Sequence, residues 1–211
     1  MGHRPKLVND KNMLRKRNLD MGSLAPTPKG NSTCNRIVAA ARKKLVEKGV
    51  DGFSLRELAT SLDLKLSNVQ YYFKTREALL LHVFEREAAA DVALIEAKQS
   101  SGSEREAFRA IVRELVIRWR GDSGILMSTM GTISLHHKEF RGLYRSVYEA
   151  FYRALEASVR GMNHELDDDE VELRVRLVTA LVDGSPMQIH VGDLQTFLDR
   201  IQEQAEQIAL S

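Results

Sequence analysis

The chain has 211 residues, a formal net charge of +2, and 43% hydrophobic and 28% charged residues, which is the composition of an ordinary globular protein. That length supports one good core, or a small domain joined to a larger one. No apolar run reaches the ~18 residues that a membrane span needs, and the charged N-terminus lacks the apolar segment of a secretory signal. The single cysteine, Cys34, excludes an internal disulfide and fits a cytoplasmic location.

Charge is distributed unevenly along the chain. Residues 1–84 hold 16 Lys/Arg against 7 Asp/Glu, whereas residues 85–211 hold 15 against 22. A basic N-terminal part joined to an acidic remainder is typical of a protein that meets a polyanion, although a solvated surface accounts for these counts equally well. Residues 1–30 combine seven Lys/Arg with three of the four prolines. We predict that they form a disordered basic arm, which either lies on phosphates or touches nothing.

The remainder predicts an all-α protein, because prolines are few and alternating β-branched runs are rare. Order is expected to begin near Asn31, where Asn31, Ser32 and Thr33 can cap a helix. Apolar residues then recur at helical spacing as far as Gly49, and glycine is typical of a helix end. The sequence therefore predicts a first helix that ends at this glycine and supports the helices after it.

Two short helices come next. Ser54 and Glu57 have the spacing of a capping box, which predicts a helix from Ser54 to Leu62. After a turn of about four residues, a second helix is expected over Ser67–Phe73. Two short helices behind a supporting helix describe a helix-turn-helix, whose second helix can enter a DNA major groove.

The second short helix has one apolar side. Val69 and Phe73 are four residues apart and should anchor it to the other helices. The residues left outward can hydrogen-bond to base edges or touch a thymine methyl; they are Lys65, Leu66, Ser67, Asn68, Gln70 and Tyr71. Beyond the helix end, Tyr72, Lys74 and Arg76 are placed where phosphates would run. The alternative for both tyrosines is packing under the next helix.

Residues 33–80 resemble the DNA-binding domain of the TetR (tetracycline-repressor-like) family of bacterial regulators. The resemblance rests on an ungapped pattern that includes Gly52-Phe53-Ser54-Leu55-Arg56-Glu57-Leu58-Ala59, Ser67-Asn68-Val69, Tyr72-Phe73 and Thr75-Arg76-Glu77-Ala78-Leu79-Leu80. This chain has Asp63 where the family usually has a turn glycine, and aspartate can adopt the left-handed conformation at some cost.

The resemblance implies a division of the chain and a function. Residues 31–80 would be the DNA-binding domain, and residues 81–211 a helical effector-binding and dimerisation domain. Ser54 and Arg56, together with Tyr72, Lys74 and Arg76, would hold the DNA backbone. A homodimer would bind a palindromic operator and be released by a small-molecule effector, most readily as a repressor.

Longer helices are expected near 76–98, 103–119, 123–136, 139–162, 168–190 and 192–210. The last two are the best candidates for a four-helix dimer interface, through Val171, Val175, Val178, Val182, Leu194, Phe197 and Ile201. Packing within one chain is the alternative. A pocket for an apolar or aromatic effector is expected among the middle helices, at Trp119, Met127, Met130, Tyr144, Tyr148 and Phe151. Each of these residues would serve equally well as core filling.

No catalytic pattern is present in the sequence: no phosphate-cradling glycine loop, no metal-binding pair of histidines and no activated nucleophile. His136 and His137 are adjacent, so on a helix they point about 100° apart and do not suit one metal ion. We therefore expect no enzyme activity, no cofactor and no metal. The alternative function is a small helical enzyme, or a helical scaffold or ligand-binding protein that does not bind DNA.

Overall fold

The computed structural model describes residues 28–52, 54–99, 102–188 and 193–211. Within these ranges the chain forms nine α-helices and no strand, which confirms the predicted all-α class. The helices are α2 (Pro28–Lys48), α3 (Leu55–Ser61), α4 (Leu66–Tyr72), α5 (Arg76–Gln99), α6 (Glu104–Trp119), α7 (Asp122–His136), α8 (Lys138–Met162), α9 (Asp168–Gln188) and α10 (Leu194–Leu210).

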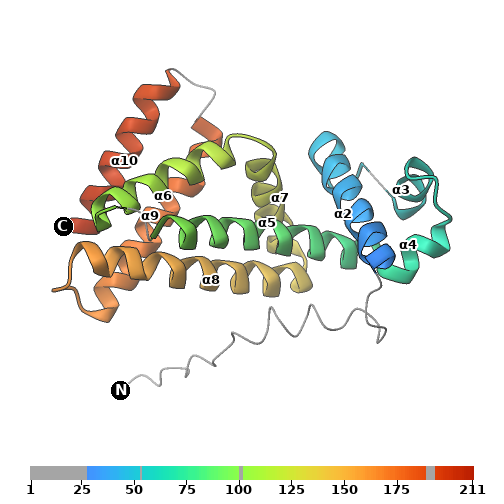
Figure 1. The fold of residues 1–211 in the computed structure, drawn as a ribbon, viewed down its shortest axis with the longest axis horizontal. Helices are drawn as coiled ribbons and strands as arrows, with labels where there is room; N and C mark the ends of the chain where they lie inside the picture. Colours follow the sequence, from blue (N-terminus) through green and yellow to red (C-terminus); the bar gives the residue numbers. More distant parts are fainter. Residues whose placement is uncertain (1–27, 53, 100–101, 189–192) are drawn as a thin grey trace.

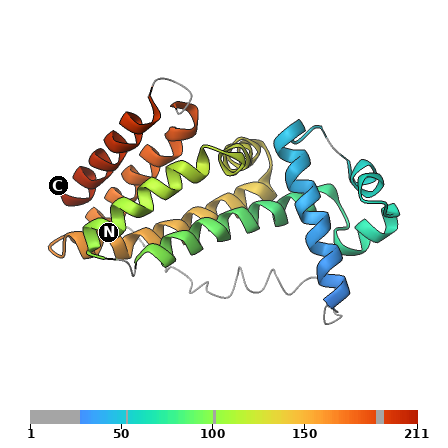
Figure 2. The ribbon, with the colours of Figure 1, turned by 45° about the horizontal axis from the view of Figure 1, so that its top comes forward.

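The helices are arranged as a small unit and a larger bundle (Figure 1). Helices α2, α3 and α4 gather around the start of α5 at one end of the molecule, and α9 and α10 lie at the other end. Figure 2 shows α5, α6 and α8 running alongside one another between these ends. Because α5 packs against α2 as well as α6 and α8, this one helix belongs to both parts.

Local sequence signals explain where most helices begin. The side chain of Ser54 accepts a hydrogen bond from the backbone N–H of Glu57, and the Glu57 carboxylate accepts one from the N–H of Ser54. This is the predicted capping box, and Ser103 and Glu106 form a second one at the start of α6. The predicted helix bounds hold to within a few residues.

The first helix begins slightly earlier than the predicted start near Asn31. Helix α2 begins at Pro28, so its first turn precedes Asn31, Ser32 and Thr33. Proline is favoured at the first helical position, because its missing N–H has no partner there in any case. Residues 28–30 therefore belong to a helix, whereas the rest of the predicted basic arm lies outside the described residues.

A tight turn follows α2, and two glycines make it possible. Gly49 has a φ of +68°, a conformation that favours glycine. At Gly52, a Cβ atom would lie 2.3 Å from the carbonyl oxygen of Lys48, so no side chain fits. The turn directs the chain back toward α3, and Cys34 is buried in the core against which α3 and α4 pack.

The far end of the bundle is held partly by polar contacts. Glu206 on α10 is buried, and its carboxylate pairs with the guanidinium of Arg109 on α6 at 2.7 Å. Gln202 donates a hydrogen bond to the carbonyl oxygen of Arg109 at 2.9 Å. In the described part of the chain, no helix has the length and hydropathy of a membrane span.

Candidate nucleic-acid interface

The turn between α3 and α4 has the geometry that a helix-turn-helix requires. The N–H groups of Leu62 and Leu64 both donate to the carbonyl oxygen of Ala59, at 3.1 and 2.9 Å. Asp63 between them has a φ of +55°. The prediction that aspartate takes the left-handed conformation here is therefore confirmed, and the turn closes without the usual glycine.

Helix α4 is anchored by its apolar side. Val69 is fully buried and Phe73 is 4% exposed, and both belong to the core that α3 and α5 share. Burying a valine side chain contributes about 1.5–3 kcal/mol, which is large for a helix of seven residues. Leu66 is half-buried against the same core, so its predicted outward position is wrong. Positions 66, 69 and 73 form one side of the helix, which leaves the opposite side free.

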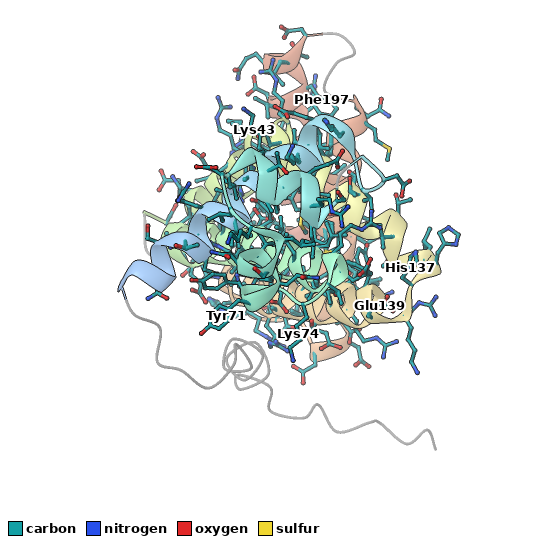
Figure 3. All side chains as sticks on the ribbon, turned by 90° about the vertical axis from the view of Figure 1, so that its right-hand side faces the viewer. Lys43, Tyr71, Lys74, His137, Glu139 and Phe197 are labelled. Carbon is teal, nitrogen blue, oxygen red and sulfur yellow. The ribbon has the colours of Figure 1, made fainter. Side chains whose placement is uncertain are left out.

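The free side of α4 carries polar residues and one aromatic residue. Exposed side chains are those of Lys65, Ser67, Asn68, Gln70, Tyr71 and Lys74. We call these six residues the α4 face. Viewed from the small unit's end, Tyr71 and Lys74 project from the edge of the molecule (Figure 3). The α4 face therefore offers donors, acceptors and cations on one short helix and its immediate flanks.

The two adjacent tyrosines differ in their surroundings. Tyr71 is 67% exposed, whereas Tyr72 is half-buried and packs against the core. Their rings meet edge to face with centroids 5.1 Å apart, a favoured arrangement for aromatic pairs. The ring of Tyr72 therefore packs against the ring of Tyr71. Tyr71 is the more exposed of the two and is better placed to contact a ligand.

The residues expected to hold phosphates are divided. Arg56 on α3 is exposed, and Ser54 is exposed but its hydroxyl is engaged in the capping box. Arg76 is half-buried, and its guanidinium donates to the carbonyl oxygen of Val50 at 2.8 Å and to Glu77 at 3.4 Å. Arg76 thus ties the start of α5 to the turn after α2, which is a structural role.

Residues 37–83 match the family model described as bacterial regulatory proteins, tetR family. The match spans the end of α2 through the start of α5 and includes the whole α4 face. The helix-turn-helix part of the chain therefore matches the TetR family. Its members are transcriptional regulators and not enzymes.

A curated relative of this chain gives the same picture. It is 35% identical over 91 residues to an uncharacterized HTH-type transcriptional regulator in the dhlA 5' region of Xanthobacter autotrophicus. That similarity covers 42% of this chain and 45% of the relative, so the chain matches less than half of the relative's length.

Two solved structures share the fold over most of the chain. A TetR transcription regulator from Haloarcula marismortui has a TM-score of 0.72 at 18% identity, and the alignment covers 85% of this chain and 97% of that one. A putative transcriptional regulator from Saccharomonospora viridis, in complex with choline, has a TM-score of 0.67 at 18% identity, with 84% and 95% covered.

The predicted effector pocket is almost filled by side chains in this structure. Trp119, Met127, Met130 and Phe151 are buried. Trp119, Met127, Tyr148 and Phe151 border a cavity of about 10 Å³, which holds at most one water molecule. Met130 does not border it, and Tyr144 faces a groove on the other side of Tyr148. The six residues therefore do not form one open pocket in this state.

The predicted dimer residues are divided as well. Val171, Val175, Val178 and Val182 are at most 1% exposed and lie in the core of this single chain, which is the alternative that the sequence left open, so they offer no surface to a second copy in this arrangement. Ile201 is also buried, whereas Leu194 and Phe197 are half-buried. The apolar surface that α9 does present to solvent comes from three other residues, Leu173, Leu177 and Met187, which are 50%, 47% and 75% exposed.

Sequence reasoning missed a cluster of charges where the small unit meets the bundle. Glu87 on α5 accepts hydrogen bonds from Arg42 on α2 at 2.6 Å, Ser123 on α7 at 2.8 Å and Arg118 on α6 at 3.2 Å. The junction cluster, as we name it, consists of Arg42, Glu87, Asp91, Arg118, Trp119, Asp122 and Ser123.

The second carboxylate of the junction cluster is the more deeply buried. Asp91 is 1% exposed; it pairs with the guanidinium of Arg118 and accepts the indole N–H of Trp119 at 3.1 Å. Burial raises the pKa of Asp91, and the contacts with Arg118 and Trp119 oppose that rise. Arg42 also pairs with Asp122 at 2.9 Å. Four helices, α2, α5, α6 and α7, are thereby joined by charge-assisted hydrogen bonds.

A sequence signal for this cluster exists. The buried side of α5 includes Leu80, Phe84, Glu87, Asp91 and Ile95, which are spaced as residues on one side of a helix. Two acidic residues on an otherwise apolar stripe predict buried charges that need cationic partners. The partners come from α2 and α6, and nothing in the sequence indicates which arginines they are.

A cleft of about 850 Å³ lies beside the junction cluster, between the small unit and α7. Val50 and Arg76 form part of one wall, and Ser128, Thr132 and His136 form part of the other. Arg76 thus faces this cleft, consistent with its contacts to Val50 and Glu77.

Proposed function

We propose that this chain is a DNA-binding transcriptional repressor that acts as a homodimer and responds to a small molecule. The observation that carries the proposal is the α4 face: six exposed residues opposite the buried Val69 and Phe73, on the second helix of a helix-turn-helix. The fold is compatible with a helical ligand-binding protein that ignores DNA, but such a protein would have no need of this exposed polar face.

The chemistry of the α4 face suits a major groove. Asn68 and Gln70 each carry an amide that can pair with adenine, and Lys65 can donate to guanine. Tyr71 and Lys74 lie at the helix end and just beyond it, where they would contact backbone phosphates together with Arg56 on α3. Two such helices in a dimer would occupy half-sites about 34–36 Å apart if the half-sites are one turn apart.

The readout is tested by selecting operators from random duplexes with the wild-type chain and with Gln70→Ala. We expect Gln70→Ala to change the selected sequence at one position of each half-site, because a bidentate pair is worth about 1–3 kcal/mol of discrimination. Lys74→Ala should instead weaken binding to all DNA sequences alike and reduce the salt dependence of binding, as loss of a phosphate contact does. Lys138→Ala, at an exposed position at the start of α8, is the control and should change neither. Selection of no sequence by the wild type would contradict the proposal.

For the homodimer, we propose an interface that includes Leu173 and Leu177 on the exposed side of α9 and the half-buried Leu194 and Phe197 of α10. The two leucines also line the outer groove between α8 and α9, so such an interface would lie at the edge of that groove. Exposed leucines beside half-buried apolar residues are typical of an interface core. Leu177→Glu should yield monomers in sedimentation velocity, because it would bury a charge at the interface. Leu135→Glu on α7, where the leucine is 69% exposed, is the matched control and should leave a dimer. Dimers of Leu177→Glu would exclude this interface.

The effector response would pass through the junction cluster. A molecule that favours one arrangement of α6 and α7 shifts the position of α2 as well, since Glu87 is shared between them. Linkage then weakens DNA binding by the difference in the effector's affinity for the two arrangements. One of the similar structures holds choline, so a small organic molecule is a reasonable class of effector for this chain.

A further inference from the structure

A groove of about 1310 Å³ runs between α8 and α9 on the outside of the bundle. Its α8 side is formed by Tyr144, Tyr148 and Tyr152, which are four residues apart and therefore share one face of the helix. Ring centroids lie 4.4 Å apart for the first pair and 5.8 Å for the second. The groove thus has an aromatic wall about two turns of helix long.

The opposite side of the groove holds a carboxylate that lacks a full set of partners. Asp183 on α9 accepts a hydrogen bond from the hydroxyl of Tyr148 at 2.8 Å through Oδ2. Its other oxygen, Oδ1, is buried and has no hydrogen-bond partner. Among the described residues, no arginine, lysine or histidine forms an ion pair with Asp183. Burial raises the pKa of Asp183 to about 6, against the opposing effect of the Tyr148 hydrogen bond.

A buried carboxylate that lacks a counter-charge is costly, and native proteins normally pair it. With a pKa near 6 the group is mostly ionised at pH 7. A metal ion does not fit the need, because no group of three potential ligands occurs among the described residues. An alkylammonium ion does fit, since its charge offsets the carboxylate and its methyl groups pack against aromatic faces.

The arginines of the groove do not fill this role. Arg141 donates to the carbonyl oxygens of Ser134 and Leu135 at the end of α7, and Arg176 lies 3.8 Å from Glu172. Arg145 and Arg153 are exposed and line the groove from α8, as do Glu149 and Glu156. Besides these four arginines and Glu149, Glu156 and Glu172, the groove is lined by Asp183. None of the four arginines forms an ion pair with Asp183, so this carboxylate is the charge that a cationic ligand would offset.

We propose that the groove between α8 and α9 is a binding site for an organic ammonium cation, held between the rings of Tyr144, Tyr148 and Tyr152 and the carboxylate of Asp183. Tyr148 also borders the 10 Å³ cavity beside Asp91 and Trp119, so rotation of its ring would connect the groove to the junction cluster. An effect of the bound cation on DNA binding rests on the proposed function, whereas binding of the cation in the groove does not.

The test is calorimetry of the full chain with choline and with its neutral carbon isostere, 3,3-dimethylbutan-1-ol. We expect choline to bind and the isostere to bind at least tenfold more weakly, because only the charge differs. Asp183→Asn should reduce choline affinity about tenfold or more, since it keeps the shape and removes the charge. Glu149→Gln, at an exposed position on the same groove, is the matched control and should change affinity less than threefold.

Three outcomes would overturn the inference. Equal affinity for choline and the isostere would show an apolar site and not a cation site. Equal losses of choline affinity in Asp183→Asn and Glu149→Gln would show that the overall charge of the groove, and not Asp183, attracts the cation. Absence of choline binding, together with a change in sedimentation for Asp183→Asn, would show that a second copy of the chain fills the groove. A chain that binds choline but no DNA would refute the proposed function alone.

Discussion

Replacing Arg118 by methionine should destabilise the protein strongly, because Arg118 is the main cation of the junction cluster. Its guanidinium pairs with Asp91 and Glu87, whose side chains are 2% and 9% exposed. Methionine fills similar volume but leaves Asp91 with only the indole N–H of Trp119. Both carboxylates would then lose the cation that they now share. Glu87 would keep its ion pair with Arg42, whereas Asp91 would have no ion pair within the described residues.

The size of the effect depends on burial. Removing one partner of a buried ion pair costs about 3–5 kcal/mol. The Arg118 side chain is itself 27% exposed, so solvent screens part of the interaction and we expect about 3 kcal/mol. For a chain of this length that corresponds to a midpoint of thermal unfolding roughly 6–12 °C lower.

The loss should depend on pH in a defined direction. Burial already raises the pKa of Asp91, and removing Arg118 raises it further. A carboxyl group whose pKa is higher in the folded state than in the unfolded state lowers the free energy of unfolding as pH rises from the lower pKa to the higher one. At a pH below both pKa values the group is protonated in the folded and the unfolded state, and the penalty is absent. The loss in free energy of unfolding caused by Arg118→Met should therefore be smaller at pH 5 than at pH 7.

The measurement is urea unfolding monitored by circular dichroism, at fixed protein concentration, for the wild type, Arg118→Met and Arg120→Met. Arg120 is exposed and only two residues away, so the same substitution there should change the free energy of unfolding by no more than about 0.5 kcal/mol. If the free energy of unfolding of Arg118→Met lies within about 1 kcal/mol of the wild-type value at pH 7, the junction cluster does not hold the small unit to the bundle.

Two further predictions concern Asp63 and Asp183. Asp63→Gly should raise the free energy of unfolding by up to about 1 kcal/mol, since glycine adopts the φ of +55° without the steric penalty that aspartate carries. Asp63→Ala measured alongside it should not raise stability, and a gain in that variant would contradict this explanation. Asp183→Asn should gain stability relative to the wild type as pH rises from 4 to 7, because the wild-type carboxyl, with a pKa of about 6, is harder to ionise when folded. Thermal unfolding of both chains across that range measures the difference, and parallel curves would show that Asp183 is not the cause.

Local signals explain why the helix-turn-helix could be predicted from the sequence. The Ser54–Glu57 capping box, the left-handed Asp63 and the spacing of Val69 and Phe73 each depend on residues within one or two helical turns. The error at Leu66 arose because a helix wheel gives direction only, whereas contact with the core half-buries that position.

Tertiary packing explains the failures in the larger bundle. The valines of α9 have the apolar spacing of an interface, but the same spacing serves a core, and packing against α6, α8 and α10 buries them within one chain. Large side chains at Trp119 and Phe151 suggested a pocket, and they instead fill most of the space between helices. The partners of Glu87, Asp91 and Asp183 come from distant segments, so no short-range pattern could name them.

The 24-residue α5 has a consequence for how small a rearrangement would matter. At 1.5 Å per residue it is about 36 Å long, and no proline or glycine interrupts it. If the bundle end stays fixed, a tilt of about 5° displaces the opposite end by about 3 Å, close to the rise of about 3.4 Å per base pair along the axis of a duplex. A few degrees at the charged junction would therefore move α4 out of register with its bases, without any helix having to bend or unfold.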